Sequence, residues 1–494
     1  MKMPDIECPP YAPVLMESTR AIGYSIESAI ADIIDNSISA SATKIEIFYN
    51  IIPHPYIAIL DNGNAMNSNE ITESMRYGSS SPSEERVESD LGRYGLGMKM
   101  ASLSQCRSMS VVSKRKNEIV ARRWNLDHII KTKSWSLEQL GQDEINELPL
   151  IKKLLENEKG TIVIWESLDR IKSGSLTLEK SLEEKMVGVK EHLELVFHRY
   201  LSGERNMKLS ISINGIKLCP FDPFFIAKST QPMAPEKIDI PGRKGKVVVT
   251  PYILPHPSNM TKLEIDKYGG KDGLRALQGF YIYRNRRLLT WGTWFGLIKK
   301  DEFTKLARVQ VDIPNSLDDL WTLDVKKSTA YPPEIVKTRL KQLVGTMSNG
   351  SKRTWLFRQK KEISSTKVHV WEKVETREGI KYIVNQEHPI LEALNDRLEN
   401  NERKLLKEYI DTIQNSLPFN NLHYDMHRDV KIAYDSEDDT KKRTLSIAKM
   451  LIEDAIKDNS IEKIMNNFEI TEPFSAYIPE IKKICQEVKI NGRY

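Results

Sequence analysis

The sequence predicts an α+β protein in which two mixed α/β regions are followed by a mainly helical one. Three observations support this prediction. Apolar residues recur at helical spacing near the N-terminus and then alternate or run together, as they do in strands. Prolines mark a boundary at 219–242, and the composition changes again near 362–368. We therefore expect domains at 1–235, 236–362 and 363–494, in line with about 150 residues per domain.

The composition is typical of a globular protein, with 40% hydrophobic and 29% charged residues among 494 positions and a net charge of +5. The four cysteines are widely spaced and form no CxxC pair. This argues against zinc ribbons and disulfide scaffolds and favours a reducing compartment. No signal peptide is visible, and no run approaches the ~18 apolar residues that a membrane span needs. We expect a cytoplasmic protein with no membrane partner.

The first region is predicted to mix helices and strands. One helix is expected over 17–42, because apolar side chains recur at helical spacing at Ile26, Ala29, Ile30, Ile33 and Ile34. A polar, serine-rich segment at 77–90 is predicted to be a mobile loop, and the glycine-rich segment 91–106 to begin a helix. A charged helix is expected near 176–200. Strands are expected at 44–50, 56–63, 109–115, 161–167 and 208–215.

The second region is predicted to be another α/β unit. Its expected strands cover 247–254, 279–289 and 307–313. A helix should begin at Pro332 and Pro333, since proline is favoured in the first turn of a helix. The remainder of the chain is charged and is expected to be mostly helical.

The first candidate site motif is Asp32-Ile-Ile-Asp35-Asn36 in the expected helix. Asp32 and Asn36 are four residues apart and therefore share one helix face. A carboxylate there can orient and deprotonate a water, and the amide oxygen of Asn36 can ligate Mg²⁺, which prefers oxygen ligands. The alternative interpretation is a polar stripe on an amphipathic helix.

The second motif, Asp61-Asn-Gly63-Asn-Ala65-Met66, follows a predicted strand directly. A carboxylate at a strand end can accept a hydrogen bond from an adenine amino group, and Gly63 lets the backbone approach the ring closely. The alternative is a simple turn, because Asn-Gly is a common turn dipeptide.

The third motif is glycine-rich and leads into a helix. Its glycines can free backbone N–H groups to wrap phosphates, and its lysine can supply positive charge. It resembles neither a Walker A loop nor a Rossmann fingerprint, so alone it is a weak signal. Its residues are Gly92, Tyr94, Gly95, Leu96, Gly97, Met98 and Lys99.

A fourth segment, Gly160-Thr161, opens a predicted strand. The Thr161 hydroxyl could contact phosphate or adenine. In isolation, an ordinary β-forming residue is the better explanation of Thr161.

Together and in this order, the four segments resemble the GHKL ATPases, which include the gyrase B subunit, the ninety-kilodalton heat-shock chaperone, sensor histidine kinases and MutL. The phrases AIADIIDNSISA, DNGNAM, MRYGSS and DLGRYGLGMKMASLSQC look most like MORC and MutL-like ATPases, especially prokaryotic relatives associated with restriction and phage defence. The resemblance covers roughly residues 15–350. It implies a layered GHKL (Bergerat) α/β sandwich, a transducer-like second domain, and a lid at 64–98 that closes over ATP.

The resemblance assigns roles to individual residues. It places Asp32 as general base, Asn36 as the Mg²⁺ ligand, and Asp61 and Gly63 at the adenine. It also places Gly95, Gly97 and Lys99 at the phosphates. Two positions depart from the family: many relatives have Glu in place of Asp32, and a second glycine in place of Ala65. The shorter Asp32 side chain predicts slow turnover, and Ala65 predicts a lid hinge of different shape.

In MutL and gyrase a lysine of the second domain touches the terminal phosphate of ATP. The segment 321–328 resembles that loop, and either Lys326 or Lys327 could fill this role. A lysine that contacts only the terminal phosphate would distinguish ATP from ADP. The alternative is a solvated basic turn.

Positive charge is concentrated in the second region. Ten basic residues and one acidic residue, Glu334, lie between Lys326 and Lys361, and Arg284, Arg286 and Arg287 lie upstream. Such clustering favours contacts with phosphates, and together with the resemblance it predicts duplex DNA as a partner of an ATP-gated homodimer. The alternative is a solvated helix face with two core aromatic residues.

The C-terminal region carries little recognisable chemistry. His423 and His427 flank Asp425 at a spacing that could bind metal on a helix, but a surface pair is the better explanation. No nuclease constellation is visible, so we expect nuclease or helicase partner proteins. A chaperone-like clamp for protein clients, or a scaffold that binds ATP and hydrolyses little, remains an alternative.

Overall fold

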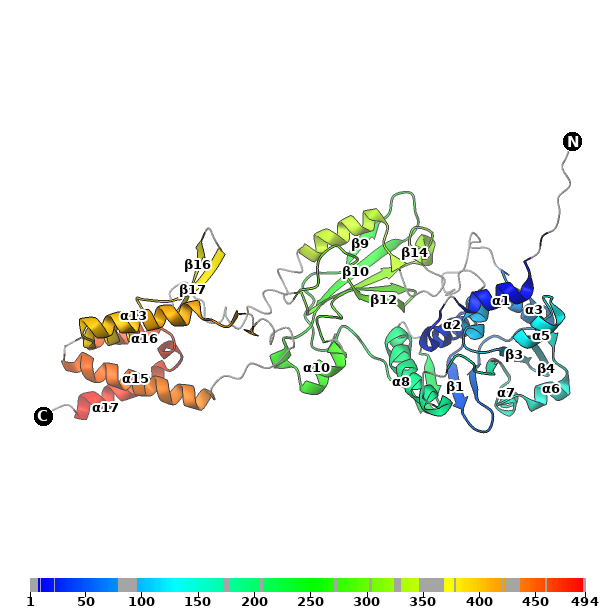
Figure 1. Cartoon of the computed structure of the whole chain (residues 1–494), viewed down its shortest axis with the longest axis horizontal. Helices are drawn as coiled ribbons and strands as arrows, with labels where there is room; N and C mark the ends of the chain where they lie inside the picture. The colour runs from blue at the N-terminus through cyan, green and yellow to red at the C-terminus, as the bar shows by residue number, and fades with distance from the viewer. Residues whose placement is uncertain are drawn as a thin grey trace. The chain divides into compact units, whose positions relative to one another are not determined.

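The computed structural model describes residues 8, 10–21, 23–78, 96–171, 177–204, 208–270, 273–301, 304–323, 330–345, 368–376, 379–419, 421–422, 436–457 and 460–491. The chain divides into two compact units, Met1–Lys352 and Arg353–Tyr494. The first unit contains two mixed sheets with their helices, and the second is mainly helical (Figure 1). The predicted α+β class is therefore confirmed.

An eight-stranded sheet forms the first half of the first unit. Its strand order is β5-β4-β3-β6-β2-β1-β7-β8, and all neighbours are antiparallel except β1 and β7. The strands are β1 (Lys44–Asn50), β2 (Tyr56–Asp61), β3 (Ser108–Arg115), β4 (Glu118–Asn125), β5 (Glu138–Gln139), β6 (Lys159–Glu166), β7 (Ser210–Ile213) and β8 (Ile216–Lys217).

Both faces of this sheet are covered, because side chains alternate between two cores along each central strand. In β6, Val163 and Trp165 join one core, whereas Ile162 and Ile164 join the other. The smaller core is covered by α6 (Gln142–Glu147) and α7 (Ile151–Glu156). The larger core is covered by α1 (Ala12–Arg20), α2 (Ile26–Ser39), α3 (Ser68–Met75), α4 (Gly97–Leu103), α5 (Leu126–Thr132), α8 (Leu178–Val196) and α9 (His198–Leu201).

The expectation of one helix over 17–42 is wrong, since α1 and α2 are separate helices. Gly23 adopts a φ of +75°, a conformation that ends helical continuity and that glycine takes at little cost. Ser25 then caps α2, accepting a hydrogen bond from the backbone N–H of Ser28 at 3.2 Å. The apolar periodicity of the two helices is similar, so it gave no sign of the break.

A five-stranded sheet with the order β12-β11-β13-β10-β9 forms the second half of the unit. A helix over 334–345 packs on it through Val336 and Leu340. The strands are β9 (Glu236–Asp239), β10 (Lys246–Ile253), β11 (Gly279–Arg284), β12 (Arg287–Thr293) and β13 (Ala307–Ile313). Smaller elements are η2 (Pro257–Asn259), α10 (Lys262–Gly269), η3 (Asn315–Leu317), β14 (Thr322–Leu323) and β15 (Ala330–Tyr331).

The single strand expected at 279–289 is a β-hairpin instead. Asn285 and Arg286 form its two-residue turn, both at positive φ (48° and 67°), and Arg284 pairs with Arg287. Turns of this kind match the twist of the flanking strands, and asparagine tolerates the left-handed conformation well. The asparagine in the middle of the apolar run was therefore the available signal.

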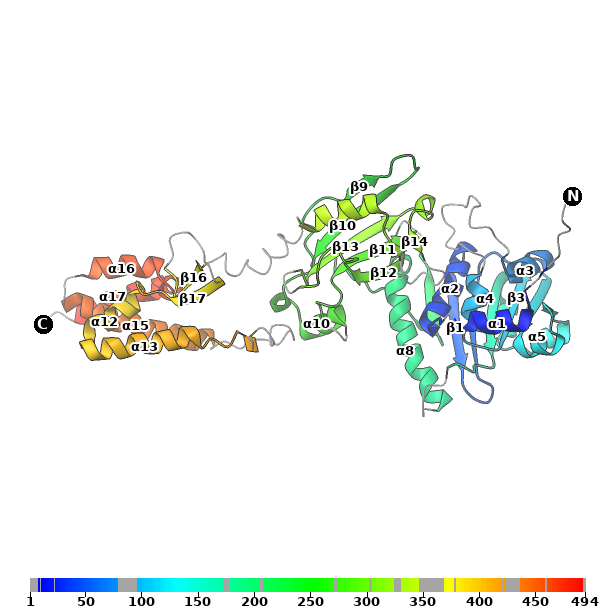
Figure 2. The same cartoon turned by 45° about the horizontal axis from the view of Figure 1, so that its top comes forward.

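The two halves of the first unit meet where this hairpin contacts α8 and α9. Both views show α8 between the sheet that contains β1 and strand β12 (Figures 1 and 2). The contact has its own small core, formed by Phe224, Tyr281, Tyr283 and Leu288. His198 hydrogen bonds to the Tyr283 hydroxyl at 2.7 Å.

Acidification should loosen this contact. Burial lowers the pKa of His198 to about 3 and that of His192 to about 4, and the guanidinium groups of Arg199 and Arg287 add to the effect. Because both rings titrate near pH 6.5 once exposed, the unfolded form binds more protons between pH 6.5 and 4. Each ring should therefore lower the local opening free energy by about 2 kcal/mol at pH 5 relative to neutral pH.

This prediction can be checked by amide hydrogen exchange in α9 and β11, after correction for intrinsic rates. Exchange should speed up by about 30-fold per ring between neutral pH and pH 5. The variant His198→Gln, which cannot titrate, should show a smaller acceleration than the wild type. Equal acceleration in the two proteins would exclude His198 as a cause.

The second unit consists of a hairpin and a helical bundle around Phe468 and Phe474. The hairpin was not expected from the sequence. The elements are β16 (Trp371–Thr376), β17 (Gly379–Val384), α12 (Pro389–Arg397), α13 (Asn400–Asn415), α15 (Glu437–Lys457), α16 (Ile461–Ile470), η4 (Phe474–Ala476) and α17 (Ile478–Asn491).

The histidine pair at His423 and His427 lies outside the described residues. None of the helices in the described ranges is long and apolar enough to cross a bilayer.

Candidate nucleotide-binding site

The predicted site residues of the first and second motifs meet where α2 crosses the end of β2. Asp32 and Asn36 lie one turn apart on α2, and Asp61 is the last residue of β2. Ser37 of α2 donates a hydrogen bond to Asp61 Oδ2 at 2.8 Å, which ties the helix to the strand end. The two motifs are thus neighbours in space although 24 residues separate them in the sequence.

Asp32 is almost completely buried, with 1% of its surface exposed. The Tyr24 hydroxyl donates to its Oδ2 atom at 3.1 Å, and Arg287 Nη2 lies 3.9 Å from its Oδ1 atom. A Cβ atom built on Gly97 would lie 3.4 Å from Asp32 Oδ2, so the first turn of α4 also borders the carboxylate. The Asp32 side chain is therefore held in one orientation, as a general base must be.

The Asn36 side chain is exposed one turn further along the same helix. An exposed amide oxygen beside a buried carboxylate suits Mg²⁺, which is commonly held by few protein oxygens together with water and substrate phosphates. No cluster of three or more histidine, cysteine or acidic residues that could hold a metal occurs among the described residues. The exposed Asn36 amide fits a Mg²⁺ ion that arrives with a nucleotide.

Asp61 is buried and accepts several hydrogen bonds. Its Oδ1 atom accepts from the Gly63 backbone N–H at 2.8 Å, and the Thr161 backbone N–H and Ser37 hydroxyl also bond to it. Burial raises the pKa of Asp61, while these three donors act in the opposite direction. A carboxylate has about four lone-pair positions, so one remains for a donor such as the adenine amino group.

Two glycines are required for the backbone to approach Asp61 closely. A Cβ on Gly63 would lie 2.9 Å from the Ala40 carbonyl oxygen, and a Cβ on Gly160 would lie 2.2 Å from the Asp61 carbonyl oxygen. Gly160 has a φ of +157°, at the edge of the region that favours glycine. The sequence singled out Gly63 for a different reason, a close approach to the adenine ring, and noted Gly160 only as the neighbour of Thr161.

Met66 and Thr161 are joined through Ser113 of β3. The Met66 backbone N–H donates to Ser113 Oγ at 2.7 Å, and Ser113 Oγ lies 3.3 Å from Thr161 Oγ1. These contacts link the segment after β2 to β3 and β6. Ser113, like Tyr24 and Ser37, was not predicted, because a single serine or tyrosine carries no sequence signal of its own.

The glycine-rich segment is described only in part. Leu96, Gly97, Met98 and Lys99 begin α4, and Leu96 and Met98 pack against the larger core. The serine-rich loop beyond Gly78 lies outside the described residues. So do five predicted site residues, whose roles stay predictions: Gly92, Tyr94, Gly95, Lys326 and Lys327.

Lys99 is engaged away from the predicted phosphate position. Its Nζ atom donates to the carbonyl oxygens of Ser74 at 2.7 Å and Arg76 at 2.8 Å, at the C-terminal end of α3. Cations are favoured at this end of a helix. Burial lowers the pKa of Lys99 to about 8. The predicted phosphate contact would require the ammonium group to leave these two carbonyls.

Arg284 and Arg287 of the β11–β12 hairpin were expected to contribute to a DNA-facing surface, but both form buried ion pairs. Arg284 donates to both carboxylate oxygens of Asp318 at 2.8 and 2.9 Å, and Arg287 extends to α2. Both side chains are buried, with 4% of their surface exposed. The expectation that these two arginines add to a DNA-facing surface is therefore wrong.

Residues 24–161 match the family model described as Histidine kinase-, DNA gyrase B-, and HSP90-like ATPase. A comparison of the chain with curated proteins gives no match. The matched segment runs from Tyr24, which bonds to Asp32, to Thr161, which bonds to Asp61. It therefore encloses the candidate site on α2, β2, α4 and β6, and the chain contains a GHKL-type ATPase domain at residues 24–161.

Proposed function

We propose that the chain is a slow ATP hydrolase that works as an ATP-gated homodimeric clamp on duplex DNA. The observation that carries the hydrolase is the arrangement on α2, where the buried Asp32 carboxylate is held by Tyr24 and lies one turn from the exposed Asn36. Asp61, with three internal donors and a remaining lone pair, recognises the adenine amino group.

In the proposed reaction, Asp32 orients a water molecule and takes one of its protons as the oxygen attacks the terminal phosphorus. The bond between that phosphorus and the bridging oxygen breaks, which releases ADP and phosphate. The Asn36 amide oxygen would hold Mg²⁺, which would supply positive charge to the phosphates. Asp32 is one methylene shorter than the glutamate of many relatives, which is why we propose slow turnover.

The clamp couples this reaction to the second domain. Lys326 or Lys327 contacts the terminal phosphate, and the contact is lost after hydrolysis. Two ATPase domains associate when ATP is bound and separate after turnover. The cycle therefore opens and closes the space between two second domains, where duplex DNA is held, and nuclease or helicase partners act on the enclosed DNA.

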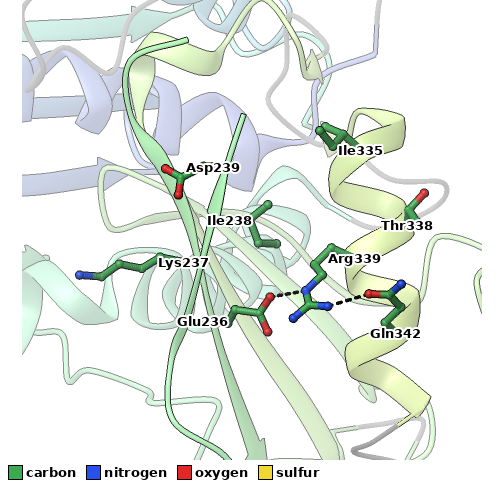
Figure 3. Close-up of a pocket in the computed structure, with 8 residues that line it drawn as sticks. All are labelled: Glu236, Lys237, Ile238, Asp239, Ile335, Thr338, Arg339 and Gln342. Carbon is green, nitrogen blue, oxygen red and sulfur yellow. Dashed lines mark hydrogen bonds and ion pairs between the residues drawn. The ribbon is translucent and has the colours of Figure 1, made fainter. Parts of the chain in front are cut away.

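The support for DNA is the run of ten basic residues from Lys326 to Lys361. Within its described part, Lys341 is exposed on the helix over 334–345. Arg339 faces a groove of 460 Å³ beside β9, where it pairs with Glu236 and donates to Gln342 at 2.7 Å (Figure 3). Because Asp239 also lines that groove, we assign the DNA contact to the lysines and not to Arg339.

Steady-state ATP hydrolysis with and without duplex DNA tests the clamp, at about 50 and 200 mM salt. We expect stimulation by DNA that fades as the salt concentration rises. The double variant K337Q/K341Q should reduce the stimulation, whereas K237Q/K246Q, which changes two exposed lysines outside the basic run, should not.

Three outcomes would contradict parts of this proposal. Hydrolysis that is indifferent to DNA at both salt concentrations would reject the DNA clamp and favour a protein client. Equal stimulation in the two double variants would reject the basic run as the contact. ATP binding without any hydrolysis would favour a nucleotide-gated scaffold.

A further inference from the structure

Arg287 of the second domain contacts helix α2 of the ATPase domain, which carries Asp32. Arg287 Nε donates to Asp35 Oδ1 at 3.0 Å and lies 2.9 Å from Asp35 Oδ2. Arg287 Nη2 is 3.9 Å from Asp32 Oδ1. The side chains of all three residues are at most 5% exposed, so the charges interact with little screening by water.

The hairpin geometry directs Arg287 to this position. The tight turn at Asn285 and Arg286 makes Arg287 the first residue of β12. The Tyr200 hydroxyl donates to the Asn285 carbonyl oxygen at 2.6 Å, which fixes the turn against the C-terminal end of α9. The Arg287 guanidinium also lies over the Phe197 ring, 5.9 Å from its centroid.

A single guanidinium thus contacts two carboxylates on one turn of α2. A buried carboxylate such as Asp35, which is 0% exposed, requires a partner of opposite charge. Asp32 has a different need, because a general base must stay within about hydrogen-bonding distance of one water position. The rigid, planar guanidinium can fix both residues at once, which a flexible ammonium group does less well.

We propose that Arg287 is a positioning residue for Asp32, so that ATP hydrolysis requires the β11–β12 hairpin to be docked on the ATPase domain. The second domain then acts on the catalytic carboxylate directly, in addition to any contact with the terminal phosphate. This inference rests on the proposed function, because it takes Asp32 to be the general base.

The test must separate positioning from folding, because Arg287→Gln alone leaves Asp35 as a buried charge and is expected to be destabilising. The double variant R287Q/D35N removes both charges together. The matched control is R284Q/D318N, which neutralises the neighbouring arginine–aspartate pair: Arg284 lies opposite Arg287 in the hairpin but bonds to Asp318 and not to α2. For each protein we would measure kcat and KM for ATP together with the thermal midpoint.

We expect R287Q/D35N to recover most of the thermal midpoint lost in R287Q. Its kcat should remain about 10- to 100-fold below the wild type, with KM little changed, because displaced catalytic groups slow chemistry without weakening substrate binding. The variant R287K should give an intermediate kcat. The control R284Q/D318N should keep the wild-type kcat.

The possible failures are distinguishable. A wild-type kcat in R287Q/D35N would overturn the positioning role, and so would an equal loss of kcat in R284Q/D318N. Turnover that persists in Asp32→Asn would instead reject the role of Asp32 as general base in the proposed function, because the base would then be another group. Loss of ATP binding in R287Q/D35N would show that Arg287 supports the site as a whole, which also overturns the inference.

Discussion

Replacing Asp32 with asparagine is expected to lower ATP turnover by about 10²- to 10⁴-fold while ATP binding is retained. The amide cannot take a proton from water, but it keeps the shape of the carboxylate, and its oxygen can still accept the hydrogen bond from Tyr24. Phosphate release and equilibrium nucleotide binding, measured on the same preparation, check both parts of this prediction. The bound nucleotide should also hold the proposed dimer closed.

The matching control is Tyr24→Phe, which removes one hydrogen bond to Asp32 and leaves the carboxylate in place. Because a hydrogen bond to a charged group contributes about 1.5–3 kcal/mol, we expect a loss of kcat of about 10- to 100-fold at most. An unchanged turnover rate in Asp32→Asn would reject Asp32 as the base.

Replacing Asn36 with alanine is expected to weaken ATP binding, which Asp32→Asn is expected to retain. We expect the affinity for Mg²⁺-ATP to fall by more than about 100-fold, because the protein oxygen that binds Mg²⁺ is removed. The exposed position of Asn36 means that the fold should be unaffected. Calorimetric titration with ATP, with and without Mg²⁺, checks this. Wild-type affinity for Mg²⁺-ATP in Asn36→Ala would place the metal elsewhere.

The sequence predicted those parts of the fold that depend on local patterns. The apolar runs of β2 and β6 are visible in the sequence because both faces of these strands are buried against a core. The helical spacing of α2 is visible because its apolar residues pack in the larger core. It did not predict the break at Gly23 or the turn at Asn285 and Arg286, since one or two residues with positive φ hardly change the apolar pattern around them.

In the candidate site, too, the sequence predicted the residues within short motifs but not their distant partners. Asp32, Asn36, Asp61 and Gly63 could be predicted, because their chemistry and spacing lie within short segments. The partners Tyr24, Ser37 and Arg287 could not be identified as such, because their roles depend on which distant segments the fold brings together. Arg287 is the clearest case: its sequence neighbours suggested a DNA contact, whereas its side chain is buried against α2.

The central claim is that one site on α2 and β2 binds ATP and hydrolyses it with Asp32. The most direct test is ATP binding and phosphate release measured side by side for the wild type, Asp32→Asn and Asn36→Ala. We predict both activities in the wild type, binding alone in Asp32→Asn, and neither at the same Mg²⁺-ATP concentration in Asn36→Ala. Phosphate release that persists in Asp32→Asn, or ATP binding that is the same in all three proteins, would contradict the account.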